Sequence, residues 1–532
     1  MLQSLRVSRV CSGKIGASHS CLEQAGVAFN DRVISSASMS PPSLSPPSLY
    51  APRARAWLIA ATFLISYAYF YQGTGWNQNS HFDLARALAE QHSVRIDRYQ
   101  WNTGDKALYQ GHYYSDKAPG LSLAALPAIS AAGMLARVFP VSRVPAWQLY
   151  LATILTSSLA IALAAAVLFL MLLNWNITPG AAAFAVAVFG LGTPMWIYAT
   201  QFWGHALTSA CLVFAFAAAD RLQHPGSSTR HFALAAAVGM AAGWAVVTDF
   251  PAAIPAVMIG VMGLVYCWRS APSTKNFLWN VAALCLTAGL CLATILIYQK
   301  AAFGSPFRLG YEYVVNYQDT LQQGALGLTY PKWHALLSLL FGKRCGLLLF
   351  APVLVVAPFG FRRLWRAGLP WPSLCVSAGI AIYYLLFNAS YLHWQAGASF
   401  GPRYLSPGLP FACLFVAPVW QRSRPAVKAV LAGLAAFGVG VALAGVATRS
   451  VIPEAVTFPI KDALQAFARG ELYQQGEAWN LGARAGLHGM MSLAPLLVAW
   501  VVVAAIWWRM VRNERQAPVG TDLKPASAAH VQ

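Results

Sequence analysis

Charge is scarce in this chain, and acidic residues are the scarcest charged type. Of the 532 residues only 10% are charged, and 37 Lys and Arg stand against 17 Asp and Glu. Ordinary soluble domains carry about 25% charged residues. Hydrophobic residues make up 58% of the chain. This composition excludes an ordinary soluble protein and indicates an integral membrane protein.

Several functional patterns are missing as well. The nine Cys lie mostly inside apolar runs and show neither zinc-ligand spacing nor a disulfide framework. No Walker loop, dinucleotide-binding fingerprint, HExxH or GxSxG motif is present, which disfavours ATP-driven transport. The net charge of +20 is spread over loops and helix ends, without a basic stripe. We therefore expect no nucleic-acid partner.

Long apolar runs dominate what is present. About twelve stretches near the ~20 residues that cross a bilayer recur between Trp57 and Trp508. They predict an all-α integral membrane domain over residues 51–515, with about twelve transmembrane helices. Residues 1–50 include the Ser/Pro-rich stretch "SSASMSPPSLSPPSLYAP" and are predicted to be disordered, as is the tail 516–532.

Clusters of Arg and Lys fall at alternate ends of the apolar runs, starting with Arg53 and Arg55. The positive-inside rule then predicts a cytoplasmic N-terminus and four long outer connections at about 72–145, 300–345, 390–408 and 448–486. This topology requires the Pro- and Gly-interrupted run 119–138 to be an interfacial helix, and a full crossing is the alternative. Because long loops are commonly functional, we expect the chemistry on the outer face.

The first candidates lie in "NQNSHFDLARALAEQHSVRID", which predicts a short amphipathic helix. Asp83 and Arg86 are i,i+3 neighbours on it and are expected to interact. A solvated ion pair is one interpretation. In the other, Arg86 holds the Asp83 carboxylate at the membrane surface, where it serves as a general base.

The next candidates lie around "HYYSDKAPG". Lys117 stands at headgroup height just before an apolar helix, so it is either a snorkelling anchor or a cation for a lipid phosphate. Asp105 and Asp116 belong to the same loop and are either solvated acids or groups that hold a metal or a sugar hydroxyl. The sequence identifies no cofactor and no defined metal site, and it leaves a divalent metal open.

Three further candidates come from later segments. His205, in "QFWGHALTS", suits proton transfer, although a plain interface histidine is the alternative. Asp249, in "VVTDFPAA", lies between two apolar runs, and an acid within the membrane is a functional candidate. Arg403, in "SFGPRYL", could bind a phosphate bidentately or fix its loop through a salt bridge.

The order of these features resembles the GT-C fold of polytopic membrane glycosyltransferases that use polyprenyl-phosphate sugars, such as the protein O-mannosyltransferases and the lipid A aminoarabinose transferases. The resemblance rests on the "D-x-x-R" helix after the first span, the Lys-Pro-type interfacial helix, and the segments "FGSPF" and "SFGPRYL". It implies that Asp83 matches the catalytic aspartate, Arg86 the basic residue three positions on, and Lys117 the lysine that contacts the carrier phosphate. The chain departs from the pattern at Leu84 and His205, where acids are common, and in having Lys-Ala-Pro-Gly for Lys-Pro-Pro.

The implied function is transfer of a sugar from a polyprenyl-phosphate donor to a glycan, lipid or protein acceptor. It would occur at the extracytoplasmic face of a bacterial inner membrane. Lys117, with Arg86 or Arg403, would neutralise the leaving phosphate, and Asp83 would take the acceptor's proton. The alternatives are a transporter or flippase, a polymerase or ligase of envelope glycans, and a non-enzymatic scaffold.

Overall fold

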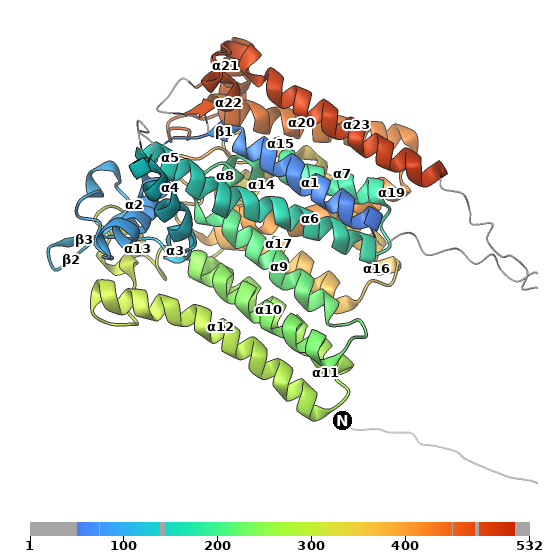
Figure 1. Ribbon diagram of the computed structural model, residues 1–532, viewed down its shortest axis with the longest axis horizontal. Coiled ribbons are helices and arrows are strands. Elements are labelled where there is room, and N and C mark those ends of the chain that lie inside the picture. Colours follow the sequence, from blue (N-terminus) through green and yellow to red (C-terminus); the bar gives the residue numbers. More distant parts are fainter. Residues whose placement is uncertain (1–49, 74, 139–143, 450, 474–477, 517–532) are drawn as a thin grey trace, which may run out of the picture. The chain divides into compact units, whose positions relative to one another are not determined.

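The computed structural model describes residues 50–73, 75–138, 144–449, 451–473 and 478–516. The segments predicted to be disordered, 1–50 and 516–532, lie outside the described residues except for Tyr50 and Gln516. The described residues form a helical assembly, to which two short two-stranded sheets are added (Figure 1). The predicted all-α membrane fold is therefore confirmed, while the domain boundaries stay a prediction.

Among the described residues, seven helical stretches have the length and composition needed to cross a bilayer. They are Pro145–Asn174, Ser228–Thr248, Phe250–Ser270, Thr274–Phe303, Trp371–Ser390, Pro425–Thr448 and Gly489–Glu514. They contain α5 (Val144–Thr153), the π-helical turn η2 (Ile154–Ser158), α6 (Leu159–Asn174), α10 (Ser228–Thr248), η3 (Phe250–Ala252), α11 (Ala253–Ser270), α12 (Thr274–Phe303), α17 (Trp371–Ser390), α20 (Pro425–Thr448), η7 (Gly489–Leu493) and α23 (Ala494–Gln516). The figure of about twelve spans stays a prediction.

Other helices pack among these seven stretches without meeting the same criterion. They are α1 (Tyr50–Ala68), α7 (Pro179–Leu191), α8 (Met195–Ala199), α9 (Gly204–Arg221), α18 (Leu409–Leu414) and α19 (Val416–Arg422). α1 packs on α6, α6 packs on α9, and α9 packs on α10 and α11. Close helix contact depends on small residues: a Cβ added at Gly239 of α10 would lie 2.1 Å from the Leu284 carbonyl oxygen of α12.

The first and last helices of the membrane domain are joined. The Arg55 guanidinium of α1 lies 2.6 Å from the Glu514 carboxylate of α23. Near the other end of the pair, β1 (Phe70–Tyr71) forms an antiparallel sheet with β4 (Trp479–Asn480). Figure 1 shows the two helices running side by side. The chain thus closes on itself through residues far apart in the sequence.

The first long connection forms a folded cap. It contains α2 (Trp76–Gln91), η1 (Gln100–Asn102), β2 (Lys106–Tyr109), β3 (His112–Ser115), α3 (Gly120–Ala124) and α4 (Leu126–Val138). β2 and β3 form a hairpin whose two turn residues, Gln110 and Gly111, have φ of 50° and 80°. Both central residues at positive φ match a type I′ turn. The apolar run 119–138 is divided between α3 and α4, and the 13 residues of α4 extend only about 20 Å, too short to cross a bilayer.

The remaining elements are short. They are η4 (Gly310–Tyr313), α13 (Gln318–Leu321), α14 (Trp333–Phe341), α15 (Leu347–Phe350), η5 (Pro352–Val356), α16 (Ala357–Arg366), η6 (Arg403–Gly408), α21 (Pro459–Ala468) and α22 (Leu481–Arg484). In Figure 1 the cap, α13, α21 and α22 gather at one end of the helices, whereas α16 and α19 lie at the other. Parts of the long connections expected at about 72–145, 300–345 and 448–486 therefore lie at one end of the helices. The side of the membrane on which that end lies stays a prediction.

Candidate functional site

A cavity of about 680 Å³ opens between the cap and the helix ends. We call it the main cavity. Its polar lining includes Asn77, His81, Lys117, His205, Asp249 and Arg403, and its apolar lining includes Ile254, Leu326, Leu386 and Phe387. The lining residues come from α2, the segment before α3, α9, α10, α11, α17 and η6, together with the loop that contains η4 and α13. Several sequence candidates that are distant along the chain thus meet here.

Asp83 does not line the main cavity. Residues on an α-helix are about 100° apart, so Asn77 and His81 share a face of α2 while Asp83 lies on the opposite one. Its carboxylate is buried in the cap and accepts a hydrogen bond from Asn102 Nδ2 at 3.2 Å. Burial raises the pKa of Asp83 to about 7, although Asn102 and the nearby cations oppose the shift. The structure gives no support to Asp83 as the base at this cavity.

Arg86 makes different contacts from those predicted. Its Nε and Nη2 donate to the Glu90 carboxylate at 3.0 and 3.1 Å, and its guanidinium lies 4.3 Å from the centroid of the Tyr99 ring. The predicted pairing with Asp83 is wrong, because the acid one turn further along α2 takes the guanidinium in a bidentate i,i+4 contact. Arg86 stays in the cap and outside the cavity lining.

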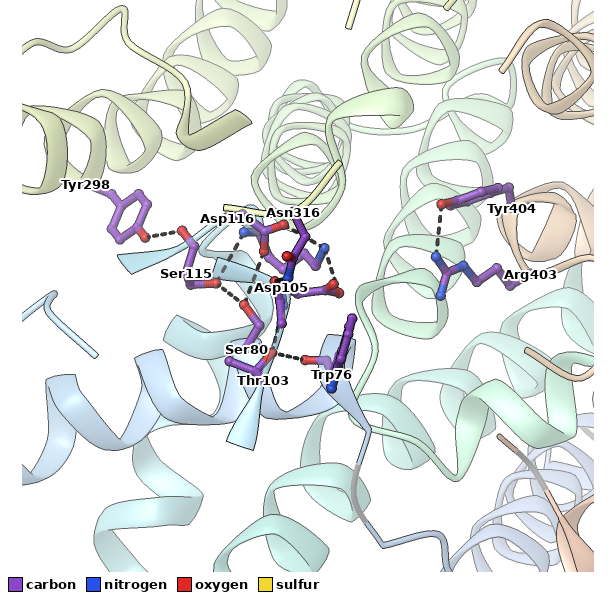
Figure 2. Close-up of polar contacts among 12 residues, drawn as sticks. Trp76, Ser80, Thr103, Asp105, Ser115, Asp116, Tyr298, Asn316, Arg403 and Tyr404 are labelled. Atoms are coloured by element: carbon purple, nitrogen blue, oxygen red, sulfur yellow. Dashed lines mark hydrogen bonds and ion pairs between the residues drawn. The ribbon is translucent and has the colours of Figure 1, made fainter. Parts of the chain in front are cut away.

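Lys117 is the centre of a charge cluster with Asp105 and Asp116, the two acids labelled in Figure 2. Its ammonium lies 2.9 Å from Asp105 Oδ2 and 3.0 Å from Asp116 Oδ2. Burial alone would lower the pKa of Lys117, but the two carboxylates outweigh it and hold that pKa well above its usual value. Burial, and then the charge of Asp105, raise the pKa of Asp116 against the pull of Lys117. The Lys117 ammonium is therefore held by two carboxylates at the edge of the main cavity.

Short hydroxyl side chains hold this cluster in place. The Ser80 hydroxyl on α2 is 2.8 Å from the Ser115 hydroxyl at the end of β3, and it donates to Asp116 Oδ1 at 3.3 Å. Thr103 Oγ1 accepts from the Asp105 backbone N–H at 3.1 Å. Figure 2 shows these residues converging from α2, the hairpin and the loop before it. The stretch "HYYSDKAPG" thus supplies one side of a polar network, and α2 supplies the other.

The two acids of the cluster both point at the Lys117 ammonium. Among the residues that the structure describes, no group of three or more His, Cys, Asp or Glu side chains is arranged as a metal site. The ammonium takes the place that a cation ligated by both carboxylates would occupy. In this arrangement Asp105 and Asp116 serve to neutralise Lys117.

Arg403 presents a cation of a different kind. Its Nη2 donates to the Tyr404 hydroxyl at 3.0 Å, and its guanidinium lies 5.0 Å from the centroid of the Trp203 ring. In the described part of the chain it forms no ion pair. Figure 2 shows its guanidinium directed toward the side on which Asp105 and Asp116 lie. The salt bridge that was one of the two interpretations of Arg403 is absent from the described residues, and its partly buried guanidinium lines the cavity.

His205 and Asp249 meet at the cavity wall. His205 Nδ1 lies 3.0 Å from Asp249 Oδ2. Asp249 terminates α10 and precedes η3, so its carboxylate lies at a helix end instead of deep between two spans. Two residues that the sequence analysis singled out separately therefore form one pair.

Sequence reasoning missed several lining residues. Asn77 and His81 line the cavity from α2, and Tyr391 after α17 and Tyr404 of η6 line it as well. Burial, followed by the charges of Lys117 and His205, lowers the pKa of His81 to about 3, which keeps its ring neutral. The i,i+4 spacing of Asn77 and His81 was a usable signal of a shared helix face. For Tyr391 and Tyr404 the sequence carries no such signal.

The fold of this chain is like that of the solved protein ArnT. It is similar to the crystal structure of ArnT from Cupriavidus metallidurans bound to undecaprenyl phosphate, with a TM-score of 0.50 and 15% identity over 87% of this chain and 72% of that chain. The apo structure of the same protein matches with a TM-score of 0.49 and 16% identity over 78% and 69%. No family model matches the sequence. No curated protein matches it either. The resemblance inferred from the sequence is thus confirmed for the fold.

Proposed function

We propose that this chain is a membrane glycosyltransferase that takes a sugar from a polyprenyl-phosphate donor and transfers it to an acceptor of the cell envelope. The main cavity is the proposed reaction site. The observation that carries the proposal is the combination in one cavity of an apolar wall with a guanidinium that lacks a carboxylate partner among the described residues. A lipid-linked phosphate needs both features.

The cationic side of the cavity fits a phosphate. Arginine binds phosphate oxygens through two parallel N–H donors, and such charge-assisted bonds are stronger than neutral ones. The Arg403 guanidinium is available for such bonds, because it has no carboxylate partner among the described residues. Lys117, in contrast, is held by Asp105 and Asp116. In the proposal Arg403 contacts the donor phosphate and stabilises the charge that develops as it leaves.

The apolar side fits a polyprenyl chain. Ile254 of α11 and Leu386 and Phe387 of α17 line the cavity and belong to stretches that are apolar enough to cross a membrane. A donor whose phosphate lies at Arg403 can therefore lay the first part of its tail against these helices. The likeness to the undecaprenyl-phosphate complex of ArnT supports the same class of donor.

Donor binding can be measured apart from transfer. Purified protein is titrated with undecaprenyl phosphate and with undecaprenol, which has the same tail and no phosphate. We expect the phosphate form to bind at least about tenfold more tightly, which corresponds to one charge-assisted hydrogen bond. Arg403→Gln should remove that preference. The matched control is Arg308→Gln, because Arg308 lies outside the cavity lining and donates to the Tyr109 hydroxyl at 2.8 Å.

Transfer is tested with a panel of polyprenyl-phosphate sugars and extracted envelope glycans, lipids and proteins as acceptors. The expected result is consumption of one donor and an acceptor whose mass rises by one sugar. If the purified protein instead moves the lipid-linked sugar across vesicle membranes and leaves it intact, the transporter alternative replaces this proposal. Extension of a glycan by many units would indicate a polymerase.

A further inference from the structure

The pair formed by His205 and Asp249 has no role in the binding of the donor phosphate as proposed above. His205 is the second residue of α9, and Asp249 directly follows α10, 44 residues later. Both side chains line the main cavity, and His205 Nδ1 and Asp249 Oδ2 are 3.0 Å apart. An imidazole anchored at Nδ1 by a carboxylate is the arrangement that prepares a histidine to accept a proton at Nε2.

The backbone brings these two residues together. A Cβ added at Gly204 would lie 2.9 Å from the Thr248 carbonyl oxygen, closer than real Cβ atoms come to such an atom. Only glycine lets α9 begin so near the end of α10. Since His205 follows Gly204 and Asp249 follows Thr248, this contact sets the two side chains against each other.

Aromatic rings fix the orientation of the imidazole. The centroids of the Tyr404 and Tyr198 rings lie 5.7 and 6.3 Å from that of His205, with interplanar angles of 84° and 88°. In the described part of the chain no hydrogen bond to His205 Nε2 is present, so Nδ1 is the anchored nitrogen. When Nδ1–H donates to Asp249, Nε2 carries the free lone pair.

We propose that His205 is the general base that deprotonates the acceptor hydroxyl, with Asp249 as its positioning residue; this inference rests on the proposed function. The acceptor oxygen forms a bond to the anomeric carbon as the bond between that carbon and the phosphate oxygen breaks. The phosphate leaves with the electron pair as polyprenyl phosphate. The acceptor's proton goes to His205 Nε2, and Asp249 stabilises the imidazolium. After the products leave, the proton passes to water.

Other charged and titratable groups face His205 and shape its response to pH. They are Asp249 of α10, His81 of α2, Lys117 before α3, Tyr198 of α8, Tyr311 of η4, Tyr391 after α17, and Arg403 and Tyr404 of η6. The transfer rate should fall at acid pH, because a protonated imidazole cannot accept a proton.

The test compares transfer with donor binding in three variants. His205→Gln should lower kcat about 10²–10⁴-fold, the usual contribution of a general base, while undecaprenyl phosphate binds within about twofold of wild type. It should also lose the acid limb of the pH–rate profile. Asp249→Asn should lower kcat and alter that profile, and Asp249→Glu should restore part of the rate. His112→Gln is the matched control, since His112 Nδ1 lies 2.8 Å from Asp97 Oδ2 in an exposed pair outside the cavity lining.

The outcomes separate this inference from the proposed function. If wild type transfers sugar and His205→Gln retains more than about a third of the rate, or loses binding and rate equally, the role of His205 is overturned while the proposed function stands. If wild type binds undecaprenyl phosphate but transfers sugar from no donor, both are overturned. Should His205→Gln fail to yield folded protein, Asp249→Asn decides by the same criteria.

Discussion

Two cations reach the main cavity from different parts of the chain, and they are held in opposite ways. Lys117 comes from the folded cap and contacts two carboxylates at 2.9 and 3.0 Å. Arg403 comes from η6 and contacts a hydroxyl and an aromatic face, without an ion pair in the described part of the chain. Lys117 is therefore already neutralised within the fold, whereas the charge of Arg403 remains available to a ligand. The first stabilises the cap, and the second is the proposed phosphate-binding group.

Removing the neutralised cation should have the largest effect on stability. Lys117→Met leaves Asp105 and Asp116 facing each other in a buried site, and breaking a buried ion pair in this way costs about 3–5 kcal/mol. We expect a clear fall in Tm in detergent. The double variant Lys117→Met/Asp105→Asn removes one of the two orphaned charges and should recover part of the loss. Equal Tm values for wild type and Lys117→Met would contradict the comparison.

Removing the free cation should affect binding instead of stability. Arg403→Gln is expected to weaken undecaprenyl phosphate by about 2–5 kcal/mol, or roughly 30-fold and more, the range for truncating one partner of a desolvated charge pair. Its Tm should stay near that of wild type, because no carboxylate among the described residues loses a partner. Arg403→Lys keeps the charge but loses the planar fork, so it should bind with intermediate affinity. A large loss of Tm with unchanged binding would reverse the two roles.

Asp83 extends the comparison between groups held in the cap and groups that face the cavity, because it is an acid buried in the cap. Its pKa is raised to about 7 in the folded chain, against about 4 in an unfolded chain. At pH values between these two pKa values, the folded chain binds one more proton than the unfolded chain. The free energy of unfolding therefore falls as the pH rises from about 4 to about 7. Asp83→Asn removes this pH dependence. The Tm of the variant should match that of wild type near pH 4 and exceed it at pH 8, where its free energy of unfolding should be higher by on the order of 1–3 kcal/mol.

The same variant tests the role that the resemblance implied for Asp83. We expect Asp83→Asn to retain transfer, since its side chain lies outside the cavity lining. Abolished transfer in a variant with unchanged donor binding would show that Asp83 reaches the reacting groups after all.

The smallest expected effect concerns the support of the Lys117 cluster. Ser80→Ala removes the hydroxyl that contacts Ser115 and Asp116. The expected loss is about 1 kcal/mol, the usual net value of a hydrogen bond, visible as a small fall in Tm. Ser93→Ala is a suitable control, because among the described residues Ser93 Oγ accepts a single local hydrogen bond, from the exposed Arg95 N–H. A larger effect of the control would contradict the role of Ser80.

Sequence reasoning reached the fold class and several members of the cavity. Apolar runs predicted a helical membrane domain, and Lys117, His205, Asp249 and Arg403, chosen from separate segments, all line one cavity. Each signal was local: a charge or an imidazole beside an apolar run is rare enough to be noticed without knowing its partners.

Which of these side chains contact each other could not be predicted from the sequence. Arg86 has acids at both i−3 and i+4, and which of them it contacts depends on how α2 is rotated. That rotation is fixed by tertiary contacts, such as Ser80 with Ser115, and it turns Asp83 into the cap while His81 faces the cavity. Likewise His205 meets Asp249 only because Gly204 lies against Thr248. These are properties of packed helices, and no spacing along the chain records them.

The bond between Arg55 and Glu514 has a consequence for biogenesis. The two residues are separated by 459 positions, so a ribosome that has delivered α1 to the insertion machinery must make almost all of the remaining chain before the arginine meets its acid. An unpaired arginine is costly in a bilayer, and during translation α1 must depend on headgroups, water or a membrane chaperone at that end. Nascent chains stopped short of α23 should therefore be more exposed to quality-control proteases than the completed chain.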